Sequence, residues 1–311
     1  MLEQRAGMLA RIREFMAQRS ILEVETPILS PAGNPDPNIP SLTTTVNFPQ
    51  RQEPGTYYLH TSPEFHMKRL LAAGSGPIYQ ITKVFSDQEA GRIHQPEFTM
   101  LEWYRPGFDQ QMLMDEVTEL LAALGLAGNE RYPYARLFAD HTGLNPHTCD
   151  LLALQEQART LGLQTTSVDR SLLLDVVFSH AVAPHLGREQ PLFIYDYPAC
   201  QAALARIRRD DVAVAERFEL FIGGMEIANG YHELCDSAEQ SQRFDRENAV
   251  RAQRGLTPMP VDEQLLAALR HGLPDCAGVA LGLDRLLLAL TGNRELTQVI
   301  TFPVEPAATT S

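Results

Sequence analysis

Two glutamates flank a double glycine in the segment Glu219-Leu-Phe-Ile-Gly-Gly-Met-Glu226, and this arrangement restricts the fold of the chain more than any other feature. Both glycines accept the positive φ angles that a two-residue hairpin turn requires. A turn at 223–224 pairs residue 222 with 225, 221 with 226, and 219 with 228. Glu219 and Glu226 then lie on one face as diagonal neighbours. Two facing carboxylates repel each other unless a cation or a base lies between them, and Mg²⁺ on substrate phosphates meets this need.

A third glutamate, Glu233, follows Glu226 by seven residues. This odd offset places it on the opposite face of a straight strand, because side chains alternate along a strand. A bulge at Asn229-Gly230 is expected to return it to the first face. The alternative interpretation of the whole segment is the solvent-exposed acidic face of an ordinary hairpin.

The segment Ala277-Gly-Val-Ala-Leu-Gly-Leu-Asp-Arg285 predicts a strand, a glycine turn and a helix start. Gly282 lets the backbone approach a ligand closely, and the first turn of the helix offers N–H groups to an anion. Arg285 in that turn can bind a phosphate through two nitrogens. The alternative is a buried strand and helix, with Arg285 in a structural ion pair.

Two further strands are expected at 78–85 and 97–105, joined by a polar loop over 86–95. A pair of strands with such a loop can enclose a planar ligand. Glu102 and Tyr104 are two residues apart and therefore share one strand face, so both can point into one pocket. The alternative is an ordinary hairpin in which Phe98 and Trp103 serve packing.

The remaining pattern predicts an α+β protein. Helices are expected at 2–19, 62–73, 110–125, 151–161, 170–183, 238–253, 262–271 and 283–291. Strands are also expected at 21–26, 41–48, 56–60, 191–196, 212–234 and 297–302, with a proline-rich loop at 30–40. Ser62 is the expected N-cap of its helix, with Pro63 in the first helical position. Because strict βαβ alternation is absent, we expect an antiparallel sheet flanked by helices.

Composition excludes several classes of protein. The net charge of −13 disfavours broad binding to nucleic acid. The four cysteines include no C-x-x-C pair, which excludes a zinc ribbon and fits a reducing cytoplasm. No stretch has the length of apolar residues that spans a membrane, and P-loop, dinucleotide and H-E-x-x-H motifs are absent. We expect a single domain over residues 1–311, with 106–190 as a helical insertion.

Together these segments resemble class II aminoacyl-tRNA synthetases of the lysyl branch. Residues 11–27, ending at Pro27, resemble motif 1, which builds a homodimer; 78–105 resemble motif 2 and 277–288 motif 3. The strings TSPEFHMKRLL (61–71), PEFTMLEWY (96–104) and MEIANGYHEL (225–234) are specific to lysyl-type sites. The resemblance covers nearly the whole chain.

Met1 leads almost directly into the motif 1 helix, so no anticodon-binding domain is expected. Because it carries the sequence EWYR at 102–105 and alanine at position 280, the chain resembles the elongation factor P lysyltransferase family (GenX or PoxA type). That resemblance implies a lysine of elongation factor P as acceptor, ATP with Mg²⁺, and (R)-β-lysine or lysine as donor. It also implies a homodimer in the cytoplasm, with no membrane association and with tRNA disfavoured as a partner. Lysyl-tRNA synthetases have glycine at the position of Ala280, and the extra methyl group is expected to reshape the pocket.

The resemblance also assigns roles to residues. The amino-acid site would comprise Ser62, Pro63, Glu64, Glu102, Tyr104 and Glu233, with Glu64 and Glu102 at the amine near the carboxylate and Tyr104 and Glu233 at the distal amine. The ATP site would comprise Ser86, Asp87, Gln88, Gln95, Glu226, Ile227, Gly282 and Arg285, with Gln95 on the adenine side and Arg285 at the γ-phosphate. Glu219 and Glu226 would hold Mg²⁺, and Glu226 and Arg285 would be the catalytic residues.

One departure from the family pattern concerns the reacting phosphate. Motif 2 normally reads F-R-x-E, and here it reads Phe85-Ser-Asp-Gln88, so Ser86 replaces the arginine that binds the α-phosphate. Loss of this arginine is expected to remove several kcal/mol of stabilisation from the transition state at the α-phosphate. Lys83, Arg92 or the metal is a possible replacement. Two alternatives to the ligase therefore stay open: a non-catalytic nucleotide-binding regulator, and a shortened synthetase that still charges tRNA.

Overall fold

The computed structural model describes residues 1–304 except 51–52, 88–90 and 166. The chain divides into two compact units. The first comprises Met1–Tyr104, Cys235–Pro274 and the residues from Ala280 onward; the second comprises Arg105–Leu234 and Asp275–Val279. The expected single domain with an insertion at 106–190 stays a prediction, and the helices of the second unit lie inside that stretch.

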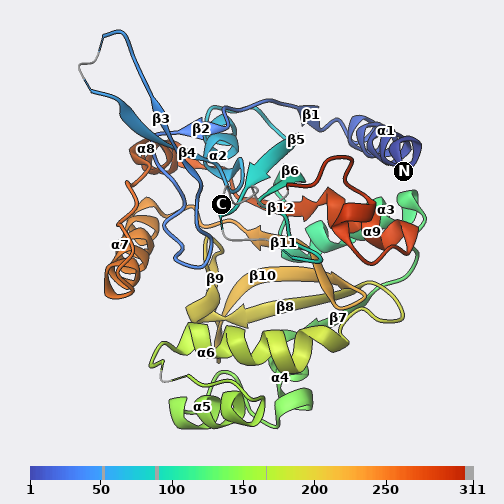
Figure 1. The fold of residues 1–311 in the computed structure, drawn as a ribbon, viewed down its shortest axis with the longest axis vertical. Helices are drawn as coiled ribbons and strands as arrows, with labels where there is room; N and C mark the ends of the chain where they lie inside the picture. Colours follow the sequence, from blue (N-terminus) through green and yellow to red (C-terminus); the bar gives the residue numbers. More distant parts are fainter. Residues whose placement is uncertain (51–52, 88–90, 166, 305–311) are drawn as a thin grey trace, which may run out of the picture. The chain divides into compact units, whose positions relative to one another are not determined.

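Among the described residues, the first unit contains helices and two groups of paired strands (Figure 1). Its strands are β1 (Leu22–Glu23), β5 (Ile78–Phe85) and β6 (Glu97–Pro106) in one sheet, and β2 (Leu29–Ser30), β4 (Gly55–Leu59) and β3 (Thr43–Val46) in the other. Its helices are α1 (Leu2–Gln18), α2 (Glu64–Ala72), α7 (Ser237–Gln253), α8 (Glu263–Gly272) and α9 (Leu283–Thr291), with a 3₁₀ turn at Leu296–Gln298. β5 and β6 pair antiparallel from Ile78 opposite Tyr104 to Phe85 opposite Glu97. This long ladder fixes which residues of motif 2 share a face.

The second unit is a sheet with helices packed against it (Figure 1). Its strand order is β11 (Met225–His232), β10 (Ala213–Ile222), β8 (Leu192–Pro198), β7 (Glu130–Pro133), and β9 (Ile207–Arg209) pairs with one end of β10. Its helices are α3 (Gln110–Leu124), α4 (Tyr134–Thr142), α5 (Leu151–Thr160) and α6 (Arg170–Val177), followed by a π-helical turn (Phe178–Val182) and 3₁₀ turns (Ala183–His185 and Ala199–Gln201). β12 (Cys276–Gly282) contributes its residues 276–279 to this unit and 280–282 to the first.

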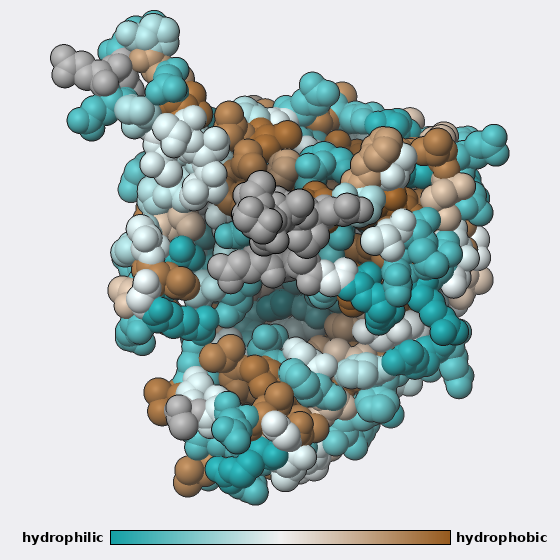
Figure 2. All heavy atoms as spheres, in the orientation of Figure 1, coloured by the Kyte–Doolittle hydropathy of each residue, from teal (hydrophilic) through white to brown (hydrophobic). Residues whose placement is uncertain are grey.

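Aromatic stacking fills the core between the helices and the sheet of the second unit. The Tyr134 ring is fully buried and stacks on Phe138 and Phe178, with ring centroids 5.6 and 5.1 Å apart. Such rings remove large apolar areas from water, so they hold α4 against the π-helical turn that follows α6. On the face drawn in Figure 2, hydrophilic residues are interspersed with smaller groups of hydrophobic ones.

The α+β prediction is confirmed, with two parallel exceptions. The described strand pairs are antiparallel except β1 with β5 and β7 with β8. Every strand in the described part of the chain belongs to these sheets, which leaves none for a separate anticodon-binding barrel. Within the same residues no helix combines the length and apolar character needed to span a bilayer.

Three local predictions differ from the structure, and one helix was not expected. The strand expected at 297–302 is a 3₁₀ turn, because Glu295 and Gln298 form a reciprocal capping box that starts a helical turn. The strand expected at 21–26 is only two residues long. The helix expected at 170–183 continues as a π-helical turn after Val177, and α4 was not expected although Gly143, at φ +72°, ends it as glycine commonly does.

The contact between Gly230 and Phe218 yields a first prediction. A Cβ at Gly230 would lie 2.3 Å from the Phe218 ring on the paired strand, which is too close for any side chain. We expect Gly230→Ala to lower the free energy of unfolding by roughly 1–3 kcal/mol, the usual cost of overpacking a core. Urea denaturation followed by circular dichroism would measure it.

Gly7→Ala is the matched control, because nothing lies within 4 Å of a Cβ at that exposed position of α1. It should leave stability unchanged or raise it slightly, since alanine favours helix. Equal stability of both variants would contradict the close packing of the hairpin.

Candidate active site

The first unit brings four of the predicted amino-acid-site residues together around one carboxylate. Glu102 is 1% exposed and accepts hydrogen bonds from Ser62 Oγ and Tyr104 OH, both at 2.7 Å. Ser62 Oγ in turn accepts from the Glu64 backbone N–H at 3.0 Å. Glu102 and Tyr104 therefore do share a strand face, as their spacing predicts. The two hydroxyl groups keep Glu102 in one orientation.

Helix α2 begins one residue later than expected, and this gives Ser62 a different task. Pro63 is the N-cap and makes no side-chain cap, so the prediction of Ser62 as N-cap is wrong. The Ser62 hydroxyl instead forms a tight turn with Glu64 and donates to Glu102. The helix start thus serves to connect two carboxylates.

Lys68 is a residue of this cluster that the sequence analysis missed. Its side chain is 2% exposed, and its Nζ donates to Glu64 Oε1 at 2.6 Å. A buried lysine requires a carboxylate partner, because an unpaired charge away from water is very costly. The i, i+4 spacing from Glu64 along a helix is a signal that could have found it.

Burial and, after it, the nearby Glu64 carboxylate raise the pKa of Glu102 to about 8, although Ser62, Tyr104 and Lys68 oppose the rise. Glu102 is therefore mostly protonated near neutral pH when no cation is bound. An ammonium group brought to it would favour the ionised form. The cluster has the chemistry of a receptor for a cationic amine.

The motif 3 segment places its arginine as predicted, at the start of α9. Gly282 is the N-cap and provides no side-chain cap. Arg285 Nε donates to the Ile93 carbonyl at 3.1 Å, which ties the helix to the motif 2 loop. The structural ion pair of this helix involves Asp284, which is 3% exposed and accepts from Arg5 at 2.6 Å and from the Thr99 N–H at 2.7 Å.

The motif 2 loop is only partly described, and Gln88 lies outside the described residues. Ser86 is 3% exposed, and its N–H donates to the Pro96 carbonyl at 3.0 Å. Asp87 N–H donates to the Pro40 carbonyl at 2.8 Å. Gln95, predicted on the adenine side, is buried, and its Oε1 accepts from the Val304 N–H of the C-terminal segment at 2.9 Å.

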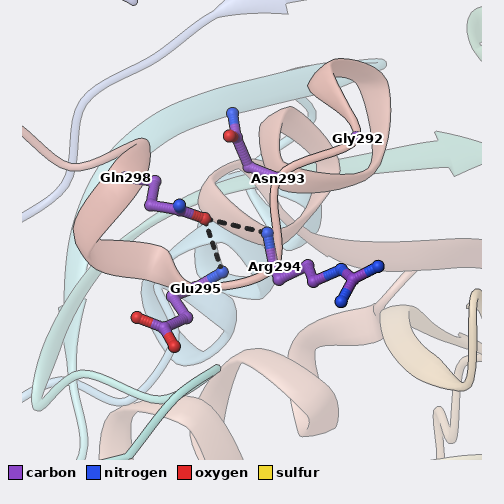
Figure 3. Close-up of a pocket in the computed structure, with 5 residues that line it drawn as sticks. All are labelled: Gly292, Asn293, Arg294, Glu295 and Gln298. Atoms are coloured by element: carbon purple, nitrogen blue, oxygen red, sulfur yellow. Dashed lines mark hydrogen bonds between the residues drawn. The ribbon is translucent and has the colours of Figure 1, made fainter.

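Two proposed substitutes for the missing motif 2 arginine already have partners. Lys83 Nζ pairs with Glu97 at 3.3 Å, and both side chains are exposed. Arg92 Nη1 donates to the Arg294 carbonyl at 2.7 Å. The side chain of Gln298 closes the same turn by accepting from the N–H groups of Arg294 and Glu295 (Figure 3).

This turn also lines a hollow of about 360 Å³, formed by Gly292, Asn293, Arg294, Glu295 and Gln298 (Figure 3). These five lining residues include none of the predicted site residues. We therefore assign no substrate to this hollow.

The second unit contains the predicted acidic hairpin. Gly223 and Gly224 have φ of +62° and +79°, as the two-residue turn requires, and Phe221 pairs with Glu226. Glu219 pairs with Asn229 rather than with residue 228, because the register shifts between Leu220 and Phe221. Glu219 and Glu226 still share a face.

The register shift in this hairpin is a β-bulge, in which Ile227 is the extra residue between Glu226 and Ala228. The sequence analysis placed the bulge at Asn229-Gly230, which is wrong; the extra residue lies two positions earlier. Either position corrects the odd offset between Glu226 and Glu233. Glu233 lies just beyond β11, is 1% exposed, and donates its N–H to the Cys276 carbonyl.

Arg217 is a second residue that the sequence analysis missed. Its guanidinium donates to Glu219 Oε1 at 2.5 Å, lies over the Tyr197 ring, and acts electrostatically on Glu226. These carboxylates raise the pKa of Arg217 above its ordinary value despite its burial. Arg217 lies two residues before Glu219 on the same strand face, a spacing visible in the sequence.

Oxygen ligands for a cation are present beside this arginine. Among the described residues no three His, Cys, Asp or Glu side chains converge on one point. Glu219 and Glu226 offer carboxylate oxygens, and Asn229 Oδ1 is a buried oxygen without a hydrogen-bond partner, while its Nδ2 lies 3.5 Å from Glu219. Mg²⁺ commonly takes one or two carboxylates and completes its shell with phosphate and water. The donor set therefore fits Mg²⁺ held together with a phosphate-bearing substrate.

Two half-buried arginines of the second unit, Arg206 and Arg208, are paired with carboxylates. Arg206 pairs with Asp275, and Arg208 pairs with Asp196 at 2.6 Å and Asp210 at 2.8 Å. Each positive charge is thus matched locally.

The predicted residues accordingly form two groups. Ser62, Pro63, Glu64, Glu102, Tyr104, Ser86, Asp87, Gln95, Gly282 and Arg285 belong to the first unit, and Glu219, Glu226, Ile227 and Glu233 belong to the second. The contacts above are made within each group. That the two groups share one substrate stays a prediction.

The strand pair of motif 2, the Gly-Leu-Asp-Arg helix start and the acidic hairpin together define a catalytic domain of the class II synthetase type. The family described as tRNA synthetases class II (D, K and N) matches residues 1–306. Three similar proteins carry the name Elongation factor P--(R)-beta-lysine ligase. They come from Yersinia enterocolitica (49% identity over 305 residues, 97% of this chain and 94% of the relative), Enterobacter sp. strain 638 (47% over 308, 98% and 95%) and Pectobacterium carotovorum (48% over 308, 98% and 95%). The chain belongs to the class II tRNA synthetase family and, within it, to the elongation factor P–(R)-β-lysine ligases, which confirms the resemblance.

The raised pKa of Glu102 yields the second prediction. Between the ordinary glutamate range and pH 8 the folded chain keeps a proton on Glu102 that the unfolded chain has released. The contribution of this group to stability therefore falls as pH rises through that window. Glu102→Gln removes the titration, so the melting temperature of the variant minus that of the wild type should increase from pH 5 to pH 9.

Thermal denaturation at several pH values would measure this difference. Glu97→Gln, an exposed position on the same strand, is the control and should show a difference that stays level with pH. If the melting-temperature difference between Glu102→Gln and the wild type also stays constant with pH, the protonated, buried carboxyl group is contradicted.

Proposed function

We propose that this protein is an ATP-dependent ligase that attaches a lysine-type amino acid, (R)-β-lysine, to a lysine side chain of elongation factor P. The observation that carries this proposal is the shared name of relatives that are 47–49% identical over nearly the whole chain. All three are named as ligases, which gives no support to the alternative of a non-catalytic regulator.

The acidic cluster of the first unit supports an amine as substrate. Glu64 and Glu102 would bind the ammonium group near the substrate carboxylate, and Ser62 and Lys68 would hold them in place. Tyr104, whose hydroxyl group bonds Glu102, is assigned to the distal amine. Glu233 has the same assignment from the family resemblance.

The chemistry proceeds in two steps. An oxygen of the amino-acid carboxylate attacks the α-phosphorus of ATP, the bond to the bridging oxygen breaks, and pyrophosphate leaves. The lysine amine of the acceptor then attacks the carbonyl of this mixed anhydride, loses a proton, and expels AMP. The protein contributes positioning and neutralisation of charge rather than a covalent intermediate.

Arg285 and Glu226 are the catalytic residues in this proposal. Arg285, anchored through its Nε to the motif 2 loop, would bind the γ-phosphate. Glu226 and Glu219 would hold Mg²⁺, which when bound supplies positive charge to the phosphates. Ile227, the bulged residue, would lie beside the nucleotide, with Gly282 near the adenine.

The remaining partner assignments follow from the same proposal. A homodimer through motif 1 is supported by the exposed apolar residues Leu2 on α1 and Leu22 on β1, 67% and 59% exposed. A protein acceptor is preferred to tRNA because the net charge is −13 and two arginines of the second unit, Arg206 and Arg208, are paired with carboxylates. We place the protein in the cytoplasm, where its acceptor takes part in translation.

Intact mass spectrometry of elongation factor P tests the proposed function. After incubation with this protein, ATP and (R)-β-lysine, the acceptor should gain the mass of one lysyl unit, and (S)-β-lysine and α-lysine should give less product. Reactions without ATP are the control. If the acceptor mass stays unchanged with all isomers while tRNA becomes charged, the synthetase alternative is correct.

Arg285→Lys provides a fourth prediction. Lysine keeps the charge but loses the planar guanidinium and the Nε bond to Ile93. We expect pyrophosphate exchange to slow by roughly 10²–10³-fold, as when one preorganised transition-state donor is removed. Arg294→Lys, an exposed arginine of the same segment, should stay within about twofold of wild type. Equal rates for both variants would remove Arg285 from the mechanism.

A further inference from the structure

We infer that His60 is a specificity-determining residue of the amino-acid site, whose Nδ1 accepts a hydrogen bond from the substrate ammonium group. The inference rests on the proposed function, because it assumes that an amine is bound beside Glu64. Nothing in the sequence motifs discussed above singles out this histidine.

Three hydrogen bonds fix the position of His60. Its backbone N–H donates to Ile28 O at 3.0 Å, its carbonyl accepts from the Phe85 N–H at 3.0 Å, and its ring Nε2 lies 2.8 Å from Lys83 O. Because a carbonyl can only accept, Nε2 must carry the hydrogen, and Nδ1 is left as an acceptor. The ring therefore presents a lone pair in one direction.

The Nδ1 atom is buried and has no hydrogen-bond partner among the residues that the structure describes, and the residue is 7% exposed. A buried acceptor left unpaired costs free energy, so such an atom in a native protein indicates a ligand or a structural purpose. Burial also lowers the pKa of His60, with the His66 charge as a minor contribution in the same direction. The ring is thus neutral and does not repel a cation.

His60 lines a small cavity with Ser62 and Glu64, two residues of the amine-binding cluster. The cavity volume is about 30 Å³. This is enough room for a small polar group such as an ammonium head. An ammonium group there would meet a carboxylate from Glu64 and the imidazole nitrogen of His60.

This geometry explains how a lysine isomer could be selected. An alkylammonium has three N–H donors, and each needs an acceptor when the group leaves water. A rigid acceptor beside the carboxylates allows only those isomers whose amine reaches this cavity while the carboxylate stays at the reacting phosphate. His60 would therefore favour the lysine isomers whose amine lies at the matching position along the substrate.

Two variants separate this role from a purely structural one. His60→Gln can keep the donor near Nε2, and with it the bond to Lys83, but loses the acceptor at Nδ1. His60→Asn is its counterpart, because its shorter amide can keep an acceptor near Nδ1 but does not reach Lys83. The measurement is the KM for (R)-β-lysine and for ATP in pyrophosphate exchange, with the melting temperature of each variant.

We expect His60→Gln to raise the KM for the amino acid about tenfold, as for loss of one hydrogen bond to a charged group, with the KM for ATP unchanged. His60→Asn should stay close to wild type in KM. His180→Gln, an exposed histidine of the π-helical turn, is the control and should change neither constant.

The reverse order, with His60→Asn impaired and His60→Gln normal, would show that His60 acts only through Lys83 and would overturn the inference. Unchanged KM values in both variants would also overturn it. If the wild-type protein shows no exchange with any lysine isomer, the proposed function itself is wrong, and this inference falls with it.

Discussion

The amino-acid site of this protein depends on two neighbouring carboxylates of the first unit, Glu64 and Glu102. The Glu64 carboxylate disfavours the ionised form of Glu102 electrostatically, and burial adds a desolvation cost to Glu102. The cost is met by one buried ammonium, Lys68, and by two hydroxyl donors, Ser62 and Tyr104. With Glu102 protonated, the cluster is close to neutral without substrate. A cationic amine would then restore the charge on Glu102, so the same arrangement is stable without ligand and favours ligand when it is present.

In the second unit, backbone geometry brings two carboxylates to one face of a hairpin. Glu219 and Glu226 share a face of the hairpin. The Arg217 guanidinium donates to Glu219 and interacts electrostatically with Glu226. The bulge at Ile227 reverses the alternation of side chains once, which turns Asn229 and the following odd-numbered residues to that face. Glycine at 230 is then required because the Phe218 ring lies directly opposite. One inserted residue thus determines which oxygens of the hairpin can act together.

Sequence reasoning found the parts of the site that depend on local spacing. The double-glycine turn, the strands of motif 2 and the shared face of Glu102 and Tyr104 all follow from period-two alternation and turn chemistry. The exact position of the bulge did not follow, because alternatives two residues apart satisfy the same parity. The start of α2 was misplaced for a similar reason, since serine can serve either as an N-cap or in a turn before it.

Contacts between distant segments had no local signal at all. Arg285 with Ile93, Val304 with Gln95, and the unpaired Nδ1 of His60 depend on tertiary structure alone.

These distant contacts bear on the departure at Ser86. The motif 2 loop is held by backbone groups, from Ser86 N–H to Pro96 O at one end and from Leu296 N–H to Arg92 O at the other. Such bonds do not depend on which side chain occupies position 86, so the loop can keep its shape after the arginine is lost. The consequence is a division of tasks: the C-terminal segment preserves the geometry of the loop, while charge at the phosphates must come from elsewhere. Arg285 Nε donates to Ile93 O of this loop, so its guanidinium is positioned in part by the same backbone.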